Sequence, residues 1–268
     1  MDLTTILGLV TGFFMLMAAF VMEGGDPMGL LQITAAMIVL GGTAGAVLVS
    51  FPMEDLKRTI RMAKLLFIKQ EHNEIEIINQ LANLSEKARK DGLLSLEQDT
   101  QANPNPLIRK GLSLVVDGIE TEVIKDILVR ETYLHEHEYH AAEKVFEAAG
   151  GYSPTMGIIG TVLGLISVLS NLEDPNELGH KIALAFIATL FGVGFANLVY
   201  LPFATKIKVK GKKEKMINDL IIEGLLSIQA GENPRIIKEK LNLSLIEKLS
   251  GKTSSEDKND DAGIGAEG

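Results

Sequence analysis

The sequence predicts an all-α integral membrane protein with four transmembrane helices and a helical lobe outside the bilayer. Two observations carry this prediction: four long stretches contain no charged residue, and the charged residues, 23% of the chain, gather between and after them. This segregation explains a positive mean hydropathy of +0.20 beside an ordinary charged fraction. The uncharged stretches are residues 3–22, 27–53, 148–172 and 182–205.

Each uncharged stretch is long enough to cross a bilayer as a helix, which needs ~20 residues for ~30 Å of hydrocarbon. Only helices and closed barrels satisfy the backbone there, so we expect four membrane helices in two hairpins with short loops. The first stretch has neither a basic segment before it nor a small-residue cleavage site after it, so we expect it to be retained rather than removed as a signal peptide.

The positions of lysine and arginine predict the orientation. Lys181 is the single basic residue in either hairpin loop, whereas the others lie in residues 54–147 and from residue 206 onward. Because basic residues near membrane ends stay on the cytoplasmic side, we expect a multi-pass protein of the cytoplasmic (inner) membrane with both termini in the cytoplasm.

The charged parts of the chain are also predicted to be helical. Apolar residues recur at helical spacing between residues 54 and 147, and the Asn-Pro-Asn-Pro sequence at 103–106 interrupts them. Residues 206–215 are strongly basic and suit the lipid headgroups of the inner leaflet. The expected organisation is membrane helices 1 and 2 (1–53), a cytoplasmic helical domain (54–147), membrane helices 3 and 4 (148–205), cytoplasmic C-terminal helices (206–249) and a disordered tail (250–268).

The membrane stretches contain no Asp, Glu, Lys, Arg or His. A protein that moves cations normally needs an ionisable group in its membrane part, so a titrating carboxylate would have to come from another polypeptide. Thr161 and Thr189 are the candidate ion-pathway residues, although each hydroxyl could simply bond the carbonyl four residues earlier. Pro154 is expected to start the third membrane helix, whereas Pro202 removes a backbone hydrogen bond from the fourth.

Small residues recur at four-residue spacing in all four stretches and permit close helix approach. The pairs are Gly8/Gly12, Gly41/Gly45, Gly160/Gly164 and Ala188/Gly192.

Several classes of function are disfavoured. The chain has no cysteine, which excludes disulfide frameworks and thiol catalysis, and its net charge of -9 argues against a nucleic-acid partner. The segment from His135 to His140 contains three histidines but lacks the i, i+4 pair of zinc metalloproteases. We find no phosphate loop or catalytic triad, and expect no enzymatic activity, metal or cofactor.

Seven short stretches together resemble the flagellar stator subunits of the MotA/TolQ/ExbB ion-channel superfamily, and the resemblance extends over residues 1–245. They are 88–97 (ARKDGLLSLE), 111–118 (GLSLVVDG), 151–165 (GYSPTMGIIGTVLGL), 188–192 with 200–202 (ATLFG, YLP), and 223–227 with 231–234 (EGLLS, GENP).

This resemblance implies a ring of identical subunits, five by analogy, around two copies of the partner MotB. MotB would supply the membrane aspartate and the peptidoglycan anchor, and proton or sodium flow would drive torque on the rotor. By match to the family's motifs, Arg89 and Glu97 correspond to a charged pair that engages the rotor switch protein of the C-ring. Pro154 and Pro202 correspond to two prolines beside the ion site.

The resemblance leaves the coupling ion open. Sodium-type members tend to carry threonine at the position of Thr161, whereas threonine at the position of Thr189 occurs in both types. The sequence around Thr189 and the other matching stretches are similar to proton-type members. Two alternative functions remain at this stage: an energiser subunit like ExbB or TolQ in an envelope complex, and a membrane scaffold that conducts no ions.

Overall fold

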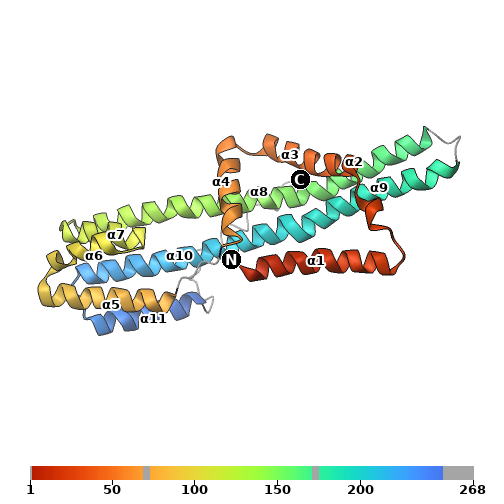
Figure 1. The fold of residues 1–268 in the computed structure, drawn as a ribbon. Helices are drawn as coiled ribbons and strands as arrows, with labels where there is room; N and C mark the ends of the chain where they lie inside the picture. The colour runs from red at the N-terminus through yellow and green to blue at the C-terminus, as the bar shows by residue number, and fades with distance from the viewer. Residues whose placement is uncertain (1, 69–72, 171–174, 250–268) are drawn as a thin grey trace, which may run out of the picture. The chain divides into compact units, whose positions relative to one another are not determined.

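A computed structural model describes residues 2–68, 73–170 and 175–249, which fold almost entirely into helices (Figure 1). The first helices are α1 (Leu3–Met22), the 3-10 turn η1 (Pro27–Leu30), α2 (Ile33–Ala36), the π-helical turn η2 (Met37–Gly41), α3 (Gly42–Ser50) and α4 (Met53–Leu65). Next come α5 (Glu74–Asp91), the 3-10 turn η3 (Leu93–Leu96), α6 (Glu97–Ala102) and α7 (Pro106–Val116). The last are α8 (Thr121–Leu169), α9 (Pro175–Phe195), the π-helical turn η4 (Ala196–Tyr200), α10 (Leu201–Gln229) and α11 (Pro234–Leu249).

The four predicted membrane helices are confirmed as helices long and apolar enough to cross a bilayer, namely Leu3–Met22, Pro27–Ser50, and parts of Thr121–Leu169 and Ala185–Gln229. The second ends earlier than the uncharged stretch that predicted it. Phe51 is extended, with φ -129° and ψ 144°, because Pro52 disfavours the helical conformation in the residue before it. The tail predicted to be disordered, 250–268, lies outside the described residues.

The chain divides into two compact units. The first comprises residues 1–70 and 136–211, and the second comprises residues 71–135 and 212–268, each in its described parts. These units are defined by packing within the chain, whereas the predicted domain boundaries separate membrane from cytoplasmic segments. The predicted boundaries therefore remain predictions.

The second unit has a continuous aliphatic core. Its helices α5, α7 and α11, with the start of α8 and the end of α10, bring together Leu81, Leu112, Leu128, Leu225 and Leu241, all 0% exposed. Fully burying one such side chain contributes ~1.5–3 kcal/mol. The predicted breaks frame these helices: Asn-Pro pairs at 105–106 and 233–234 start α7 and α11, while Asn103-Pro104 follows the end of α6 and Gly231, at φ +71°, follows the end of α10.

The first unit contains the membrane helices and a small aromatic cluster. The ring of Phe203 meets Phe67 and Phe146 edge to face, at centroid distances of 5.9 and 5.7 Å. Along α1, by contrast, large side chains such as Leu7 and Phe14 are at least 60% exposed. Such apolar surface fits contact with lipid or with other membrane helices.

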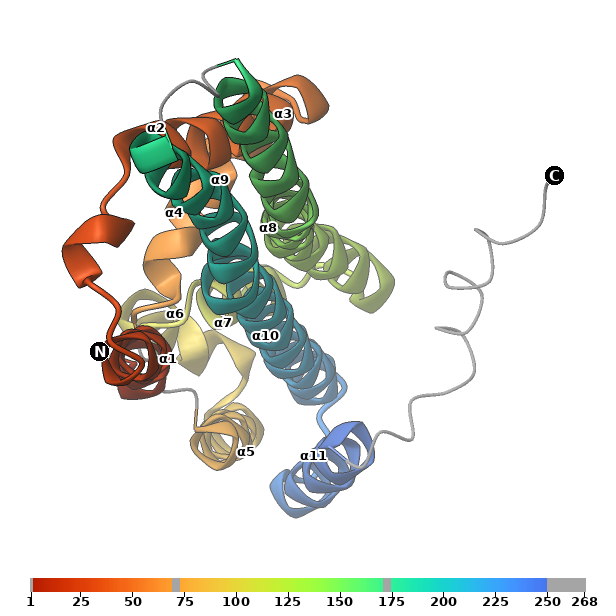
Figure 2. The ribbon, with the colours of Figure 1, turned by 90° about the vertical axis from the view of Figure 1, so that its right-hand side faces the viewer.

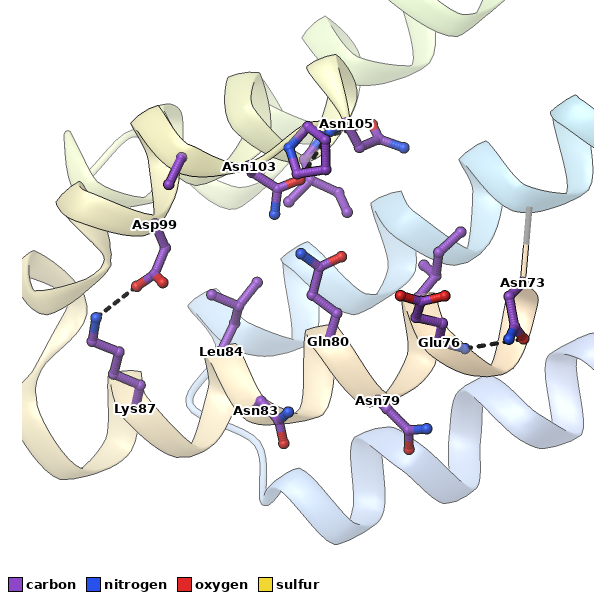
Figure 3. Close-up of a pocket in the computed structure, with 14 residues that line it drawn as sticks. Asn73, Glu76, Asn79, Gln80, Asn83, Leu84, Lys87, Asp99, Asn103 and Asn105 are labelled. Atoms are coloured by element: carbon purple, nitrogen blue, oxygen red, sulfur yellow. Dashed lines mark hydrogen bonds and ion pairs between the residues drawn. The ribbon is translucent and has the colours of Figure 1, made fainter. Parts of the chain in front are cut away.

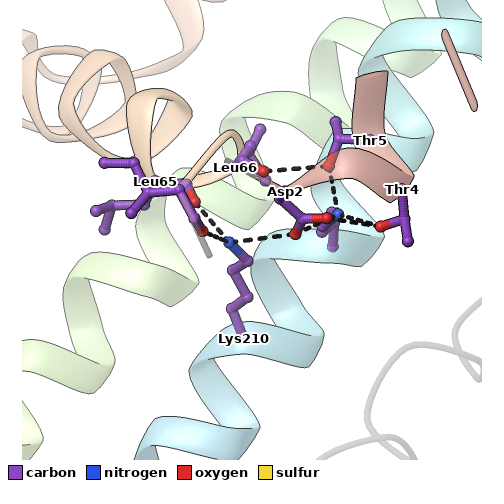
Figure 4. A network of polar contacts seen from close by, with 8 residues as sticks. Asp2, Thr4, Thr5, Leu65, Leu66 and Lys210 are labelled. Carbon is purple, nitrogen blue, oxygen red and sulfur yellow. Dashed lines mark hydrogen bonds and ion pairs between the residues drawn. The ribbon is translucent and has the colours of Figure 1, made fainter. Parts of the chain in front are cut away.

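A polar network fastens the start of α1 and the end of α4 to α10 (Figure 4). Lys206 Nζ forms an ion pair with the Asp2 carboxylate at 2.7 Å, and the Asp2 backbone N–H donates to the Phe67 carbonyl at 2.9 Å. Lys210 Nζ donates to the Leu65 carbonyl at 2.6 Å and so satisfies a carbonyl at the C-terminal end of α4. The hydrogen bond from Lys206 holds the pKa of the Asp2 carboxyl well below its usual range.

Candidate functional site

Helices α8 and α9 run side by side along a seam of small residues (Figures 1 and 2). The seam pairs Gly157 with Gly192, Gly160 with Ala188 and Gly164 with Ala185. A Cβ atom on Gly192 would lie 2.6 Å from the Ser153 carbonyl oxygen, and one on Gly157 would lie 2.9 Å from the Ala188 carbonyl oxygen. Because the obstructing atoms belong to the backbone, only glycine allows this approach, as the small-residue spacing predicted.

The seam brings Thr161 of α8 and Thr189 of α9 together. Their hydroxyl groups share a short hydrogen bond. Thr161 Oγ1 also lies 3.2 Å from the Gly157 carbonyl, its own i−4 acceptor, and 3.1 Å from the Ala185 carbonyl of α9. Thr161 therefore makes the ordinary intrahelical contact and an interhelical one as well.

Two hydroxyl and two carbonyl oxygens thus converge at a half-buried point, on Thr161, Thr189, Gly157 and Ala185. Oxygen atoms of this kind replace the hydration shell of a cation in channel proteins, and hard cations prefer them. The four contributing residues carry no titratable group, so the cluster can contact an ion or a protonated carboxyl but cannot itself bind and release a proton.

The structure places Pro154 differently from the prediction. Pro154 lies inside α8, which runs unbroken from Thr121 to Leu169, so the expectation that it starts the helix is wrong. A proline here leaves the Gly150 carbonyl without its usual N–H donor. The preceding turn contains Gly150 and Gly151, which have no side chains to crowd the ring. Pro154 and Thr161 are seven residues apart, so they lie on the same face of α8, two turns from each other.

Pro202 lies in the first turn of α10 and is exposed. The π-helical turn η4, which ends at Tyr200, stands directly before it. In a regular α-helix the proline ring would clash with the Leu198 carbonyl, and the wider turn accommodates the ring. No hydrogen bond among the described residues links Pro202 to the hydroxyl cluster.

Arg89 and Glu97 belong to the second unit. Arg89 lies in the last turn of α5, Glu97 begins α6, and both side chains are exposed. The ion pair between Lys87 and Asp99, at 2.7 Å, joins the same two helices. This ion pair links α5 and α6 beside the turn that carries Arg89 and Glu97.

The histidine-containing segment of α8 contacts charged residues. Glu138 pairs with Arg61 of α4 at 3.7 Å. Glu143, whose side chain is 9% exposed, binds Lys208 at 2.8 Å, with His140 3.5 Å away. These ion pairs link α8 to α4 and α10.

Ser153 is a residue that the sequence reasoning did not single out. Its side chain is fully buried, and Ser153 Oγ donates to the Gly192 carbonyl across the seam at 2.9 Å. The available signal was its spacing from Gly157, Gly160 and Gly164, which places a small polar residue on the same stripe of α8.

Sequence models of two families match this chain. The MotA/TolQ/ExbB proton channel family matches residues 99–220, and the family called Motility protein A N-terminal matches residues 6–92. Among individual proteins, Motility protein A of Bacillus subtilis is 35% identical over 246 residues, 91% of each chain. Chemotaxis protein PomA of Vibrio alginolyticus is 35% identical over 241 residues, 90% of this chain and 94% of PomA.

Two solved MotAB structures share the fold. A MotAB structure from C. jejuni superposes with a TM-score of 0.87 at 31% identity, covering 91% of this chain and 96% of that one. The flagellar MotAB stator complex from Bacillus subtilis gives a TM-score of 0.84 at 34% identity, covering 93% and 100%.

Proposed function

The chain belongs to the MotA/TolQ/ExbB proton channel family, and from this premise we propose that it is a subunit of a flagellar stator. With a MotB-type partner it forms an ion channel in the inner membrane and converts ion flow into torque that powers motility. One observation carries the proposal: similarity to motility proteins and to MotAB complexes extends over nine-tenths of the chain rather than over one motif.

The proposed mechanism follows from the oxygen cluster and from its lack of a titratable group. A carboxylate of the partner enters beside Thr161 and Thr189, where it is costly to keep charged against apolar helices. Binding of an ion neutralises the carboxylate. The partner then prefers a different position relative to this subunit. Because ions bind from one side of the membrane and leave on the other, down their gradient, repeated binding and release bias one direction of movement between the two proteins. The ion is cargo, and the mechanism requires no cofactor.

A deletion strain tests the function directly. We expect cells lacking this chain to assemble flagella but not to swim, and to recover swimming when the chain is supplied again. Normal swimming by the deletion strain would contradict the proposal and would leave the envelope energiser or the non-conducting scaffold as alternatives. Relatives named Motility protein A favour the stator over both.

We expect Thr161→Ala to reduce swimming speed by weakening ion binding, because it removes one of two hydroxyls from the cluster. A lost contact of ~1.4 kcal/mol corresponds to about tenfold in ion affinity. Thr155→Ala is the matched control, since Thr155 is exposed on the same helix. Speed would be measured over a range of external sodium with and without a protonophore. A parent strain indifferent to sodium couples to protons, and equal speeds of Thr161→Ala and the parent under all conditions would remove the cluster from the ion path.

We propose that Arg89 and Glu97 contact the rotor switch protein, and expect Arg89→Glu to reduce swimming while the membrane complex still assembles. An exposed charge steers a transient encounter, so its reversal turns attraction into repulsion. Lys90→Glu is the control: it makes the same change on the neighbouring residue, which pairs with Glu86 at 2.5 Å. Equal swimming of the two variants at equal protein levels would exclude a special role for Arg89.

The assembly is proposed as a ring of five copies around two partner chains, with both termini in the cytoplasm. The exposed apolar side chains of α1 fit contact with lipid or other helices. The count of copies would be read from the mass of the purified complex. Accessibility of an introduced terminal cysteine to a membrane-impermeant reagent would test the orientation.

A further inference from the structure

An open groove lies in the second unit between α5 and the α6–α7 segment, with a volume of about 680 Å³ (Figure 3). This volume falls in the range of ligand sites, ~300–1,000 Å³. Carboxamide side chains dominate its polar lining: Asn73, Asn79, Gln80, Asn83, Asn103 and Asn105. The proposed ion path and rotor contact use none of them.

Asn103 is the most buried of these amides, with 6% of the residue exposed. Its Oδ1 accepts the Asn105 backbone N–H at 3.0 Å, but its Nδ2 donates to no other residue that the structure describes. Figure 3 shows this side chain pointing from the α6–α7 segment toward Gln80 on α5. This N–H group is open to the groove, so it can donate to a ligand that enters there.

Charge in the groove disfavours an anionic ligand. Its lining contains Glu76, Lys87 and Asp99, and Lys87 is engaged by Asp99 at 2.7 Å. The helix N-termini beside it are also occupied: Asn73 Oδ1 caps α5, and Asn105 Oδ1 accepts the Leu107 N–H at 2.9 Å. A nucleotide or phosphate needs basic side chains or free helix N–H groups, and the lining residues offer neither.

A polypeptide fits this lining better. A carboxamide has both donors and an acceptor, so it can pair with the C=O and N–H of a peptide group. Such hydrogen bonds do not depend on the side chains of the bound segment. The wall formed by α5 from Glu76 to Lys87 is ~16 Å long at ~1.5 Å per residue. An extended chain covers that distance with about five residues at ~3.3 Å each.

We propose that this groove binds an extended segment of another protein through the main-chain amides of that segment. The carboxylate of Glu76 lies at one side of the groove and favours a lysine or arginine in the bound segment. Gln80 and Asn103 face each other across the groove and are placed to hold the segment from both sides. None of the lining residues belongs to the hydroxyl cluster, and Arg89 and Glu97 do not line the groove, although Lys87 and Asp99 beside them do.

The test uses the full chain purified in its membrane complex and a phage-displayed library of short linear peptides. Peptides enriched on the parent protein are synthesised with a fluorescent label, and their Kd is measured by anisotropy. We expect the double variant Gln80→Ala, Asn83→Ala to bind at least tenfold more weakly. Gln98→Ala should bind as the parent does, because Gln98 is an exposed amide of α6 outside the groove.

N-methylation of the peptide backbone is the decisive second measurement. It removes main-chain N–H donors but keeps every side chain, so we expect another loss of at least tenfold. The proposal is overturned if no peptide prefers the parent to the double variant, if N-methylated peptides bind equally well, or if ATP displaces them, which would assign the groove to nucleotides. None of these outcomes depends on whether cells lacking the chain swim.

Discussion

We expect Gly192→Ala to abolish swimming and to lower the thermal stability of the purified complex. The added methyl group would meet the Ser153 carbonyl oxygen at 2.6 Å and the Gly157 Cα at 3.0 Å, and neither backbone atom can rotate away. Overpacking of this kind costs ~1–3 kcal/mol. The larger cost is functional, because separating α8 from α9 also separates Thr161 from Thr189.

Gly194→Ala is the matched control for this experiment. It lies one half-turn further along α9, and its Cβ would meet no atom within 4 Å. Swimming speed, membrane protein level and the unfolding midpoint would be measured for both variants. If Gly192→Ala swims as well as Gly194→Ala, the seam does not position the hydroxyl cluster.

We expect Pro154→Leu to abolish or severely reduce swimming without destabilising the protein. Leucine supplies the N–H that the Gly150 carbonyl lacks, and removing a proline from a helix interior is worth up to ~3 kcal/mol. The same change alters α8 two turns from Thr161, on the face that carries it. Stability and function should therefore move in opposite directions.

The unfolding midpoint of the purified complex and the swimming speed of complemented cells would be measured together. Thr155→Leu serves as the control, since it introduces the same side chain at an exposed position one residue later. A Pro154→Leu variant that swims at the parental speed would end the assignment of Pro154 to ion coupling, and one that fails to accumulate would indicate a folding role instead.

The membrane helices were predictable because their signal is local. Length and absence of charge located all four, and Pro52 explains why the second ends at Ser50. The break before α7 was equally local, since Asn105 and Pro106 form a standard helix start. Each of these features depends on residues that are neighbours along the chain.

The details of the site were not predictable for the opposite reason. Spacing predicted that Gly192 would approach another helix closely but not that the partner would be Gly157. The contact between Thr161 and Thr189 depends on that register. The helix start expected at Pro154 failed because Ser153 and Gly157, on either side of it, both pack against Gly192 of α9 and hold this part of α8 in one helix. The π-helical turns have no sequence signal of comparable strength.

The glycine seam also has a mechanical consequence. Two helices whose backbones touch have little room to slide or tilt against each other, so α8 and α9 are closely coupled along this seam. Regular helical geometry resumes only after the π-helical turn from Ala196 to Tyr200, which joins α9 to α10 just beyond the seam.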